Sequence, residues 1–304
     1  MIRNILQTGI FIWVFALIPV GCKKTENPGH PVTLNIKVYP EGDTLLIGHP
    51  AGMSVTSSEP LQEVTLEFNN KSVVLTDTPY VYQWNTYNLE EGSYDFTVTA
   101  TDKNGNPVLD SVEVYMQFAR VVIGNQTWMK ENLRRTIYSD GTPIEEVYVY
   151  NNDSSYMDTY GLLYSWHAVM HGEKSSGNNP SGVQGACPVG WHVPSREEFN
   201  EMVTYLGGEN IAGGKMKETG YDHWASPNDG ATNSSGFTGL AAGQRNANGS
   251  FDRLLKNAGF WSCTENPEDP ATAIYQCLTA IHPITRQWTD PKTMGYSLRC
   301  VKNK

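Results

Sequence analysis

The sequence has little charge and no dense cluster of positive charge. Only 18% of its 304 residues are charged, and 22 basic against 32 acidic residues give a formal net charge of −10. Proteins that bind nucleic acid neutralise its phosphates with clustered Lys and Arg. We therefore expect no nucleic-acid partner.

Motifs of common enzymes are also missing. The chain has no G-x-S-x-G, H-E-x-x-H, G-x-G-x-x-G or C-x-x-C, the patterns of hydrolases, zinc peptidases, dinucleotide enzymes and thiol or zinc sites. His167 and His171 are spaced for a shared metal, but no third ligand accompanies them. We expect no catalytic residue, no metal and no cofactor.

No apolar run reaches the ~20 residues that a membrane-spanning helix needs. The longest run, 9–20, follows Arg3 and leads into Val20-Gly21-Cys22. This end resembles a bacterial lipoprotein signal, in which the cysteine is acylated and becomes the new N-terminus. An uncleaved anchor is the alternative.

The lipoprotein resemblance implies a definite location. It implies a signal peptide over 1–22 that ends at the lipidated Cys22, and a polar tether over 23–31. The membrane would then be reached through a lipid anchor, in the outer membrane of a bacterial cell envelope. Which face of that membrane the protein occupies stays open.

Four further cysteines follow, and an even number in an exported protein predicts disulfides. They allow three pairings, of which we favour Cys187–Cys300 and Cys263–Cys277. The first pair would close a loop of 300 − 187 = 113 positions. In the chain-entropy model such a bridge contributes about 4–5 kcal/mol.

Apolar and polar residues alternate through residues 32–117, for example at Leu34, Ile36 and Val38. This pattern predicts about seven short strands in a β-sandwich. The stretch 89–106 resembles the end of bacterial immunoglobulin-like domains. Within it, a hairpin turn is favoured over a calcium loop, because the glycine is misplaced for metal binding.

Residues 118–304 have a different pattern. A hairpin with a Gly124-Asn125 turn is predicted first, and the stretch 160–170 is typical of a buried helix. Ser195 and Glu198 form the S-x-x-E capping box of a second helix, which Gly207-Gly208 ends. The Gly/Asn/Ser-rich stretch 207–250 is interpreted as mostly loop.

Several ordered blocks in this half carry a specific resemblance. They are Val122–Leu133, Tyr160–Trp166, Cys187–Ser195, Gly236-Phe237, Phe260–Ser262 and Ser297–Val301. Together they look like the Fibrobacter succinogenes major paralogous (FISUMP) domain over residues 118–304. The resemblance implies an α+β C-type lectin-like domain after the immunoglobulin-like β-sandwich.

Two related families sharpen the functional expectation. The stretches nearest to the calcium- and sugar-binding motifs of C-type lectins are Glu265-Asn266-Pro267 and Trp288-Thr289-Asp290, and their residue order differs from that of the motifs. His192–Ser195 with Glu198-Phe199 resembles a signature of formylglycine-generating enzymes, but their reactive cysteine pair has no counterpart. We expect no enzyme, and calcium binding stays open.

A ligand-binding surface is then the main functional expectation. Aromatic rings beside amide and carboxylate groups suit sugars or peptides, and loops on a rigid scaffold often carry recognition. The candidate residues are Tyr148, Tyr150, Tyr156, Tyr221, His223 and Trp224. The alternative for each ring is that it packs its loop onto the core.

The leading hypothesis is a non-catalytic cell-envelope lipoprotein. Its immunoglobulin-like stalk would display the C-terminal domain for adhesion or for binding a polysaccharide or protein. One alternative is a structural, self-assembling surface component. Another is a degenerate protein of the formylglycine-generating type.

Overall fold

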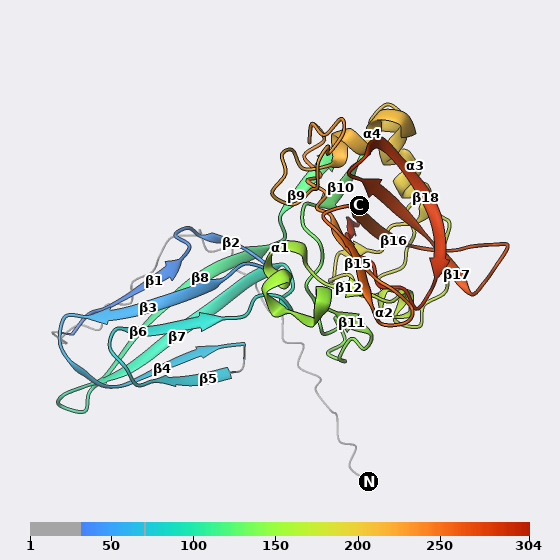
Figure 1. Cartoon of the computed structure of the whole chain (residues 1–304). Coiled ribbons are helices and arrows are strands. Elements are labelled where there is room, and N and C mark those ends of the chain that lie inside the picture. The colour runs from blue at the N-terminus through green and yellow to red at the C-terminus, as the bar shows by residue number, and fades with distance from the viewer. Residues whose placement is uncertain (1–31, 70) are drawn as a thin grey trace, which may run out of the picture.

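The computed structural model describes residues 32–69 and 71–304 (Figure 1). The predicted signal peptide 1–22, its lipidated Cys22 and the tether 23–31 lie outside these residues. Within the described part of the chain, no helix has both the length and the apolar character needed to cross a membrane.

Residues 32–117 form two packed sheets, which we call the sandwich (Figure 1). The first sheet has the order β1-β3-β6, with β1 Leu34–Tyr39, β3 Ala51–Ser57 and β6 Tyr80–Trp84. The second has the order β2-β8-β7-β4-β5, with β2 Thr44–Leu46, β8 Pro107–Gln117, β7 Gly92–Asp102, β4 Leu61–Phe68 and β5 Lys71–Leu75. The predicted β-sandwich is confirmed.

Strand alternation explains the core of the sandwich. Along β7, Phe96, Val98 and Ala100 point inward and are at most 2% exposed, while the residues between them are half-buried or exposed. The strand ends at Asp102, whose carboxylate accepts hydrogen bonds of 2.8 Å from the backbone N–H groups of Asn104 and Asn106. These residues form the predicted hairpin turn between β7 and β8.

Residues 118–304, which we call the C-terminal unit, contain three sheets (Figure 1). One has the order β13-β19-β10-β9, with β13 Trp191–His192, β19 Val301–Lys302, β10 Gln126–Met129 and β9 Arg120–Ile123. The second pairs β11 Val147–Tyr148 with β12 Leu163–Tyr164. The third has the order β15-β14-β16-β17-β18, with β15 Phe251–Leu254, β14 Ala242–Arg245, β16 Asn257–Glu265, β17 Thr272–Thr279 and β18 His282–Pro291.

The helices of this unit are short. They are the 3₁₀ turns η1 Tyr150–Asn152 and η2 Ser154–Tyr156, and the α-helices α1 Met157–Tyr160, α2 Trp166–Met170, α3 Arg196–Tyr205 and α4 Glu209–Met216. The capping box at Ser195 and Glu198 is confirmed as the start of α3. One continuous helix over 160–170 is wrong, because Gly161 has φ +73° and Leu163–Tyr164 form strand β12, which pairs with β11. The interpretation of 207–250 as loop missed α4.

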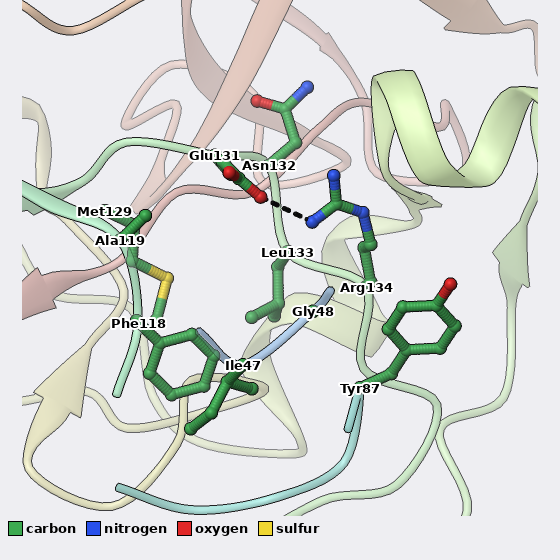
Figure 2. Close-up of a pocket in the computed structure, with 10 residues that line it drawn as sticks. All are labelled: Ile47, Gly48, Tyr87, Phe118, Ala119, Met129, Glu131, Asn132, Leu133 and Arg134. Atoms are coloured by element: carbon green, nitrogen blue, oxygen red, sulfur yellow. Dashed lines mark hydrogen bonds and ion pairs between the residues drawn. The ribbon is translucent and has the colours of Figure 1, made fainter. Parts of the chain in front are cut away.

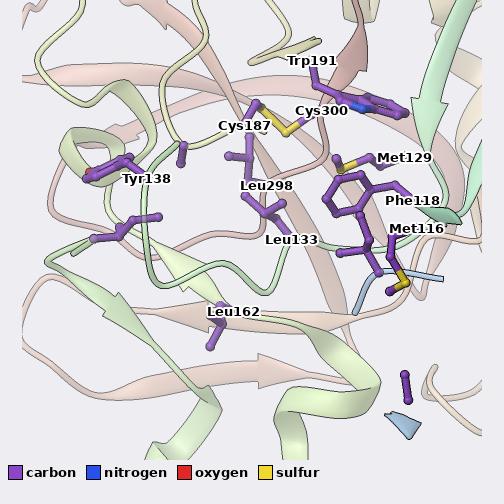
Figure 3. Packing of buried hydrophobic residues seen from close by; sticks show 14 of the residues in the cluster. Met116, Phe118, Met129, Leu133, Tyr138, Leu162, Cys187, Trp191, Leu298 and Cys300 are labelled. Carbon is purple, nitrogen blue, oxygen red and sulfur yellow. A yellow bond between two sulfur atoms is a disulfide. The ribbon is translucent and has the colours of Figure 1, made fainter. Parts of the chain in front are cut away.

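Apolar side chains join the sandwich to the C-terminal unit. Met116 lies near the end of β8 and Phe118 directly follows that strand. The Phe118 ring meets the Trp191 ring edge-on at 6.0 Å between centroids. Figure 3 shows this layer continuing through Met129 and Leu133 toward the Cys187–Cys300 disulfide. The two units therefore share one apolar core.

Ion pairs surround this shared core and complete the junction between the units. Glu90 of the sandwich contacts Arg135 Nη2 at 2.8 Å and also accepts from Val189 N at 2.8 Å. Glu91 pairs with Lys302 at 2.8 Å and with Arg120 at 3.3 Å. Glu90 and Glu91 of the sandwich are thus held by four groups from four separate parts of the C-terminal unit.

A small cavity of about 20 Å³ lies at the junction (Figure 2). Glu131 sits beside it, with Arg134 Nη1 at 2.6 Å and the sandwich residue His49 at 2.8 Å. Burial raises the pKa of Glu131, but the hydrogen bonds from His49 and Arg134 outweigh it and lower the pKa to about 2. A Cβ on Gly48 would lie 2.9 Å from Arg134, so glycine permits this close approach.

Candidate functional site

Four of the six blocks that carry the family resemblance meet around Arg299, which is 1% exposed. Its Nε donates to Asn132 Oδ1 at 2.8 Å, and its Nη atoms donate to the carbonyls of Phe237 and Thr238. The guanidinium also lies 4.2 Å from the Phe237 ring centroid. A charge this deeply buried needs such partners, so these residues build the core and present nothing to a substrate.

A second buried cluster surrounds Glu198. One of its oxygens accepts from the backbone N–H groups of Ser195 and Ser181, and the other lies 2.6 Å from His192 Nε2. Burial lowers the pKa of His192, but the bonds with Glu198 and Asn303 outweigh burial and raise it. The residues that resemble the signature of formylglycine-generating enzymes thus form a helix cap. Both carboxylate oxygens of Glu198 already have hydrogen-bond partners in this cap.

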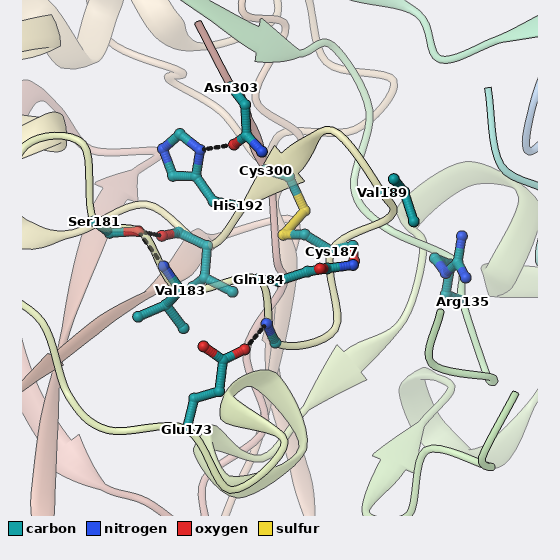
Figure 4. Close-up of a disulfide and its surroundings, with 12 residues drawn as sticks. Arg135, Glu173, Ser181, Val183, Gln184, Cys187, Val189, His192, Cys300 and Asn303 are labelled. Carbon is teal, nitrogen blue, oxygen red and sulfur yellow. Dashed lines mark hydrogen bonds between the residues drawn. A yellow bond between two sulfur atoms is a disulfide. The ribbon is translucent and has the colours of Figure 1, made fainter. Parts of the chain in front are cut away.

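The disulfide between Cys187 and Cys300 is confirmed, with 6.0 Å between the Cα atoms (Figure 4). It ties the segment before β13 to the segment before β19. The predicted bond between Cys263 and Cys277 is wrong, since both are buried free thiols. Cys277 pairs in register with Gly259, and Cys263 lies four residues further along β16. That spacing of roughly 13 Å exceeds the reach of a disulfide.

Three of the predicted rings and two neighbouring rings gather on one side of the C-terminal unit. Tyr150 contacts Tyr156 at 5.5 Å and Phe251 at 5.4 Å between centroids, and Tyr156 contacts Tyr160 at 6.1 Å. His223 meets Tyr160 edge-on at 5.6 Å. We call these five residues the tyrosine face.

The elements that form this face come from three parts of the chain. The turns η1 and η2 supply Tyr150 and Tyr156, α1 supplies Tyr160, β15 supplies Phe251, and the loop after α4 supplies His223. All except Tyr160 remain partly exposed. The rings thus pack their loops together, as the alternative expectation held, and still present edges to solvent.

Polar groups border the face. His223 Nδ1 lies 2.7 Å from Glu218 Oε2, and the Arg245 guanidinium covers the Tyr148 ring at 3.9 Å from its centroid. Burial raises the pKa of Tyr150 and of Tyr160, which keeps both phenols neutral. The arrangement offers neutral aromatic surface next to one carboxylate and one guanidinium.

Two of the predicted ligand-binding residues, Trp224 and Tyr221, lie outside the tyrosine face and differ in their exposure to solvent. Trp224 is 0% exposed and its Nε1 donates to the Gly239 carbonyl at 2.8 Å, so its prediction as a ligand contact is wrong. The indole is a core side chain because its only polar atom is satisfied inside the protein. Tyr221, in the same loop as His223, is 64% exposed and is free to meet a ligand.

Sequence reasoning missed Lys217, which is 0% exposed at the end of α4. Its Nζ donates to the carbonyls of Asp229, Thr279 and His282 at 2.7–3.0 Å. The ammonium thereby ties the loop that bears His223 to the turn between β17 and β18. A lysine beside a Gly/Asn-rich stretch gives no sequence signal of burial.

Within residues 32–69 and 71–304, no three His, Cys, Asp or Glu side chains gather in a way that could hold a metal ion.

The profile described as the Fibrobacter succinogenes major domain matches residues 121–302. No curated protein matches the sequence.

Solved structures give weak likenesses. The fibronectin(III)-like modules of Clostridium thermocellum CbhA share 18% identity over 27% of this chain and 96% of theirs, with a TM-score of 0.22. The PKD1 domain of the Vibrio cholerae metalloprotease PrtV shares 17% over 28% of this chain and 94% of its own, at 0.21. The Yersinia pseudotuberculosis adhesin InvE shares 10% over 88% of this chain and 70% of its own, also at 0.21. These TM-scores are too low to support an argument about function.

Proposed function

Because the chain belongs to the Fibrobacter succinogenes major domain family over residues 121–302, we propose a binding function for its C-terminal unit. The protein is a non-catalytic, lipid-anchored component of a bacterial cell envelope, held in the outer membrane. It binds a polysaccharide or a protein through the tyrosine face. The gathering of rings from η1, α1 and β15 is the observation that carries this proposal.

The chemistry of the face suits an uncharged, ring-shaped ligand. Tyr150 and Tyr156 offer apolar ring surface, while the Glu218–His223 pair supplies hydrogen-bonding groups at the border. Aromatic residues with a polar tip lose little conformational entropy on binding, and so they recur in recognition surfaces. Polysaccharide is therefore the first ligand class to test.

The junction supports display of this face by the sandwich. The shared core around Phe118 and the ion pairs of Glu90 and Glu91 fix one unit on the other. A rigid support keeps a recognition surface in one orientation relative to the membrane. Anchoring through Cys22 belongs to this proposal and rests on the signal-like sequence alone.

Two details complete the proposal. The C-terminal unit has a C-type lectin-like fold, an assignment supported by its long loops, its short helices and the bond between Cys187 and Cys300. It carries no catalytic group, which is supported by the state of Cys263. Burial raises the pKa of this thiol to about 12, so it is a poor nucleophile at neutral pH.

The test is a glycan array together with capture of proteins from the cell surface, using the full ectodomain. We expect binding that Tyr156→Ser weakens and that Tyr205→Ser leaves unchanged, since Tyr205 is a 66% exposed tyrosine on α3, outside the face. Empty results on both the array and the capture would contradict the proposal. Equal loss from the two variants would also contradict it.

A self-assembling surface component is the second candidate, and one exposed apolar patch favours it. Val122 on β9 is 69% exposed and Tyr205 is 66% exposed. A Cβ on Gly124 would lie 3.2 Å from the Tyr205 ring, so the β9–β10 turn and α3 adjoin. Concentration-dependent oligomers that Val122→Lys abolishes in sedimentation would favour this candidate, and a strict monomer would remove it.

A further inference from the structure

We propose that the sandwich carries a second binding site, which takes one or two rings of a neutral oligosaccharide. The site is a groove of about 470 Å³ at the end of the first sheet, beside the junction. Its lining includes Tyr39, His49, Gly52, Gln83 and Tyr87. This volume falls in the range of small-molecule sites, about 300–1,000 Å³. We call it the Tyr39 groove.

The strand register creates the hollow. Gly52 of β3 lies between Tyr39 of β1 and Gln83 of β6, so two long side chains flank a position without one. A Cβ on Gly52 would lie 2.9 Å from the Tyr82 carbonyl oxygen and 3.5 Å from Gln83 Cγ. The next residue on the same face is Ser54, which is also small and 9% exposed. Gly52 and Ser54 therefore form the floor, and Tyr39 and Gln83 form the walls.

The groove is open to solvent. Strand β6 is at the edge of the three-stranded sheet, so no strand of this sheet lies beyond Gln83. Tyr39 is 45% exposed and Val81 on the opposite wall is 48% exposed. These two apolar surfaces face a space that a ring-shaped ligand can enter from the side.

The chemistry of the lining selects an uncharged ligand. His49 is the one ionisable base that lines the groove, and its Nε2 is already paired with Glu131 at 2.8 Å. The remaining polar groups are hydroxyls and amides, notably the Gln83 amide, which has no hydrogen-bond partner in the described part of the chain. Aromatic rings beside free amides match the apolar faces and hydroxyl edges of a sugar. No Lys or Arg belongs to the lining of the groove, and the cation beside its floor is Lys37 of β1, the register partner of Ser54.

The far end of the groove is connected to the C-terminal unit. Tyr87 donates to Asp158, and His49 pairs with Glu131 across the junction. A ligand in the groove therefore contacts the part of the sandwich that the junction holds in place. Two sites on one rigid chain can bind one long polysaccharide together, which strengthens attachment without further contacts.

The test is calorimetric titration of the full ectodomain with cellotetraose, xylotetraose and mannotetraose, and with tetragalacturonate as the charged counterpart. We expect at least one neutral tetrasaccharide to bind and tetragalacturonate not to bind. Tyr39→Ala should weaken the binding about tenfold or more, as expected for loss of an anchoring ring. Tyr39→Phe, which keeps the ring and removes the hydroxyl that lies 3.1 Å from Ser54 Oγ, should bind like the unmodified protein.

The matched control is Tyr115→Ala, which removes a 42% exposed tyrosine from β8 of the same sandwich. Binding unchanged in this variant supports the proposal. It is overturned if no neutral tetrasaccharide binds, if tetragalacturonate alone binds, or if Tyr39→Ala and Tyr115→Ala have the same effect.

A variant of the tyrosine face separates this inference from the proposed function. Tyr156→Ala should leave binding at the Tyr39 groove intact. If Tyr156→Ala removes all tetrasaccharide binding and Tyr39→Ala removes none, the groove is not a site and the proposed function stands. If the reverse is found, the groove stands and the tyrosine face loses its role in sugar binding.

Discussion

In the sandwich, strands β7 and β8 pair without interruption, from Gly92 opposite Met116 to Thr101 opposite Pro107. In the C-terminal unit, by contrast, single side chains hold the loops in place. In the sandwich, many inward residues from both sheets each contribute part of the buried apolar surface. In the C-terminal unit, Arg299, Lys217 and the Cys187–Cys300 bond each hold several segments at once. Stability is therefore distributed in the first region and concentrated in the second.

This difference has a functional consequence. Loops held by a few strong contacts can vary in sequence elsewhere without loss of the scaffold, and such loops often carry recognition. The two proposed sites are built in different ways, one in each region. The tyrosine face uses irregular loops, while the Tyr39 groove uses a gap that the strand register leaves at Gly52.

Removing the disulfide should produce the largest effect. Cys187→Ala with Cys300→Ala should lower the free energy of unfolding of the C-terminal unit by about 4–5 kcal/mol, because the bond closes a loop with a sequence separation of 113. Urea denaturation followed by intrinsic fluorescence measures it. Cys263→Ala, which removes a buried free thiol, should cost less than about 3 kcal/mol. Equal losses would contradict the account.

Arg299→Leu should be nearly as costly. It leaves the carbonyls of Phe237 and Thr238 and the Asn132 amide oxygen buried without a donor, for an expected loss of about 3–5 kcal/mol. The same denaturation measures it. Arg286→Leu, which changes an exposed arginine on β18, is the control and should stay within about 0.5 kcal/mol. An Arg299→Leu protein as stable as this control would show that the buried cluster is dispensable.

A core substitution in the sandwich should cost less than either change. Val98→Ala removes two methyl groups from a 0% exposed side chain, and we expect a loss of about 1–3 kcal/mol. Val74→Ala, at a 55% exposed position on β5, is the matched control and should be close to neutral. A loss from Val98→Ala as large as that from Arg299→Leu would remove the contrast between the regions.

Acid should weaken the junction before it affects the sandwich core. The pKa of Glu131 is about 2 in the folded protein, below its ordinary value near 4.5. The stability from this group is therefore present above pH ~4.5 and is lost as the pH falls toward ~2. Hydrogen exchange of segments 47–50 and 129–135 should increase across this window. Glu131→Gln should remove that pH dependence, and an unchanged dependence would contradict the assignment.

Local patterns made much of the fold predictable. The alternation through β7, the capping box at Ser195 and the Gly124-Asn125 turn each depend on neighbouring residues, and each is confirmed. The disulfide between Cys187 and Cys300 was one of three pairings and is also confirmed. The first three features follow from neighbouring residues, and the disulfide required a choice among only three pairings.

Features that depend on distant contacts were missed. The predicted bond between Cys263 and Cys277 is wrong because strand register separates the two residues. Trp224 was expected on the surface, and Lys217 had no predicted role, yet both are 0% exposed. The Tyr39 groove depends on Gly52 facing Gln83 across β3 and β6, a register that alternation alone does not give.

The most direct test of the C-terminal unit as a recognition platform is hydrogen exchange of the full ectodomain with and without a polysaccharide selected on the array. We predict new protection in segments 147–160 and 218–224, which carry the rings and the Glu218–His223 pair. The scaffold segments around Arg299 should show no change. Protection confined to 187–199, with none at the tyrosine face, would contradict the account.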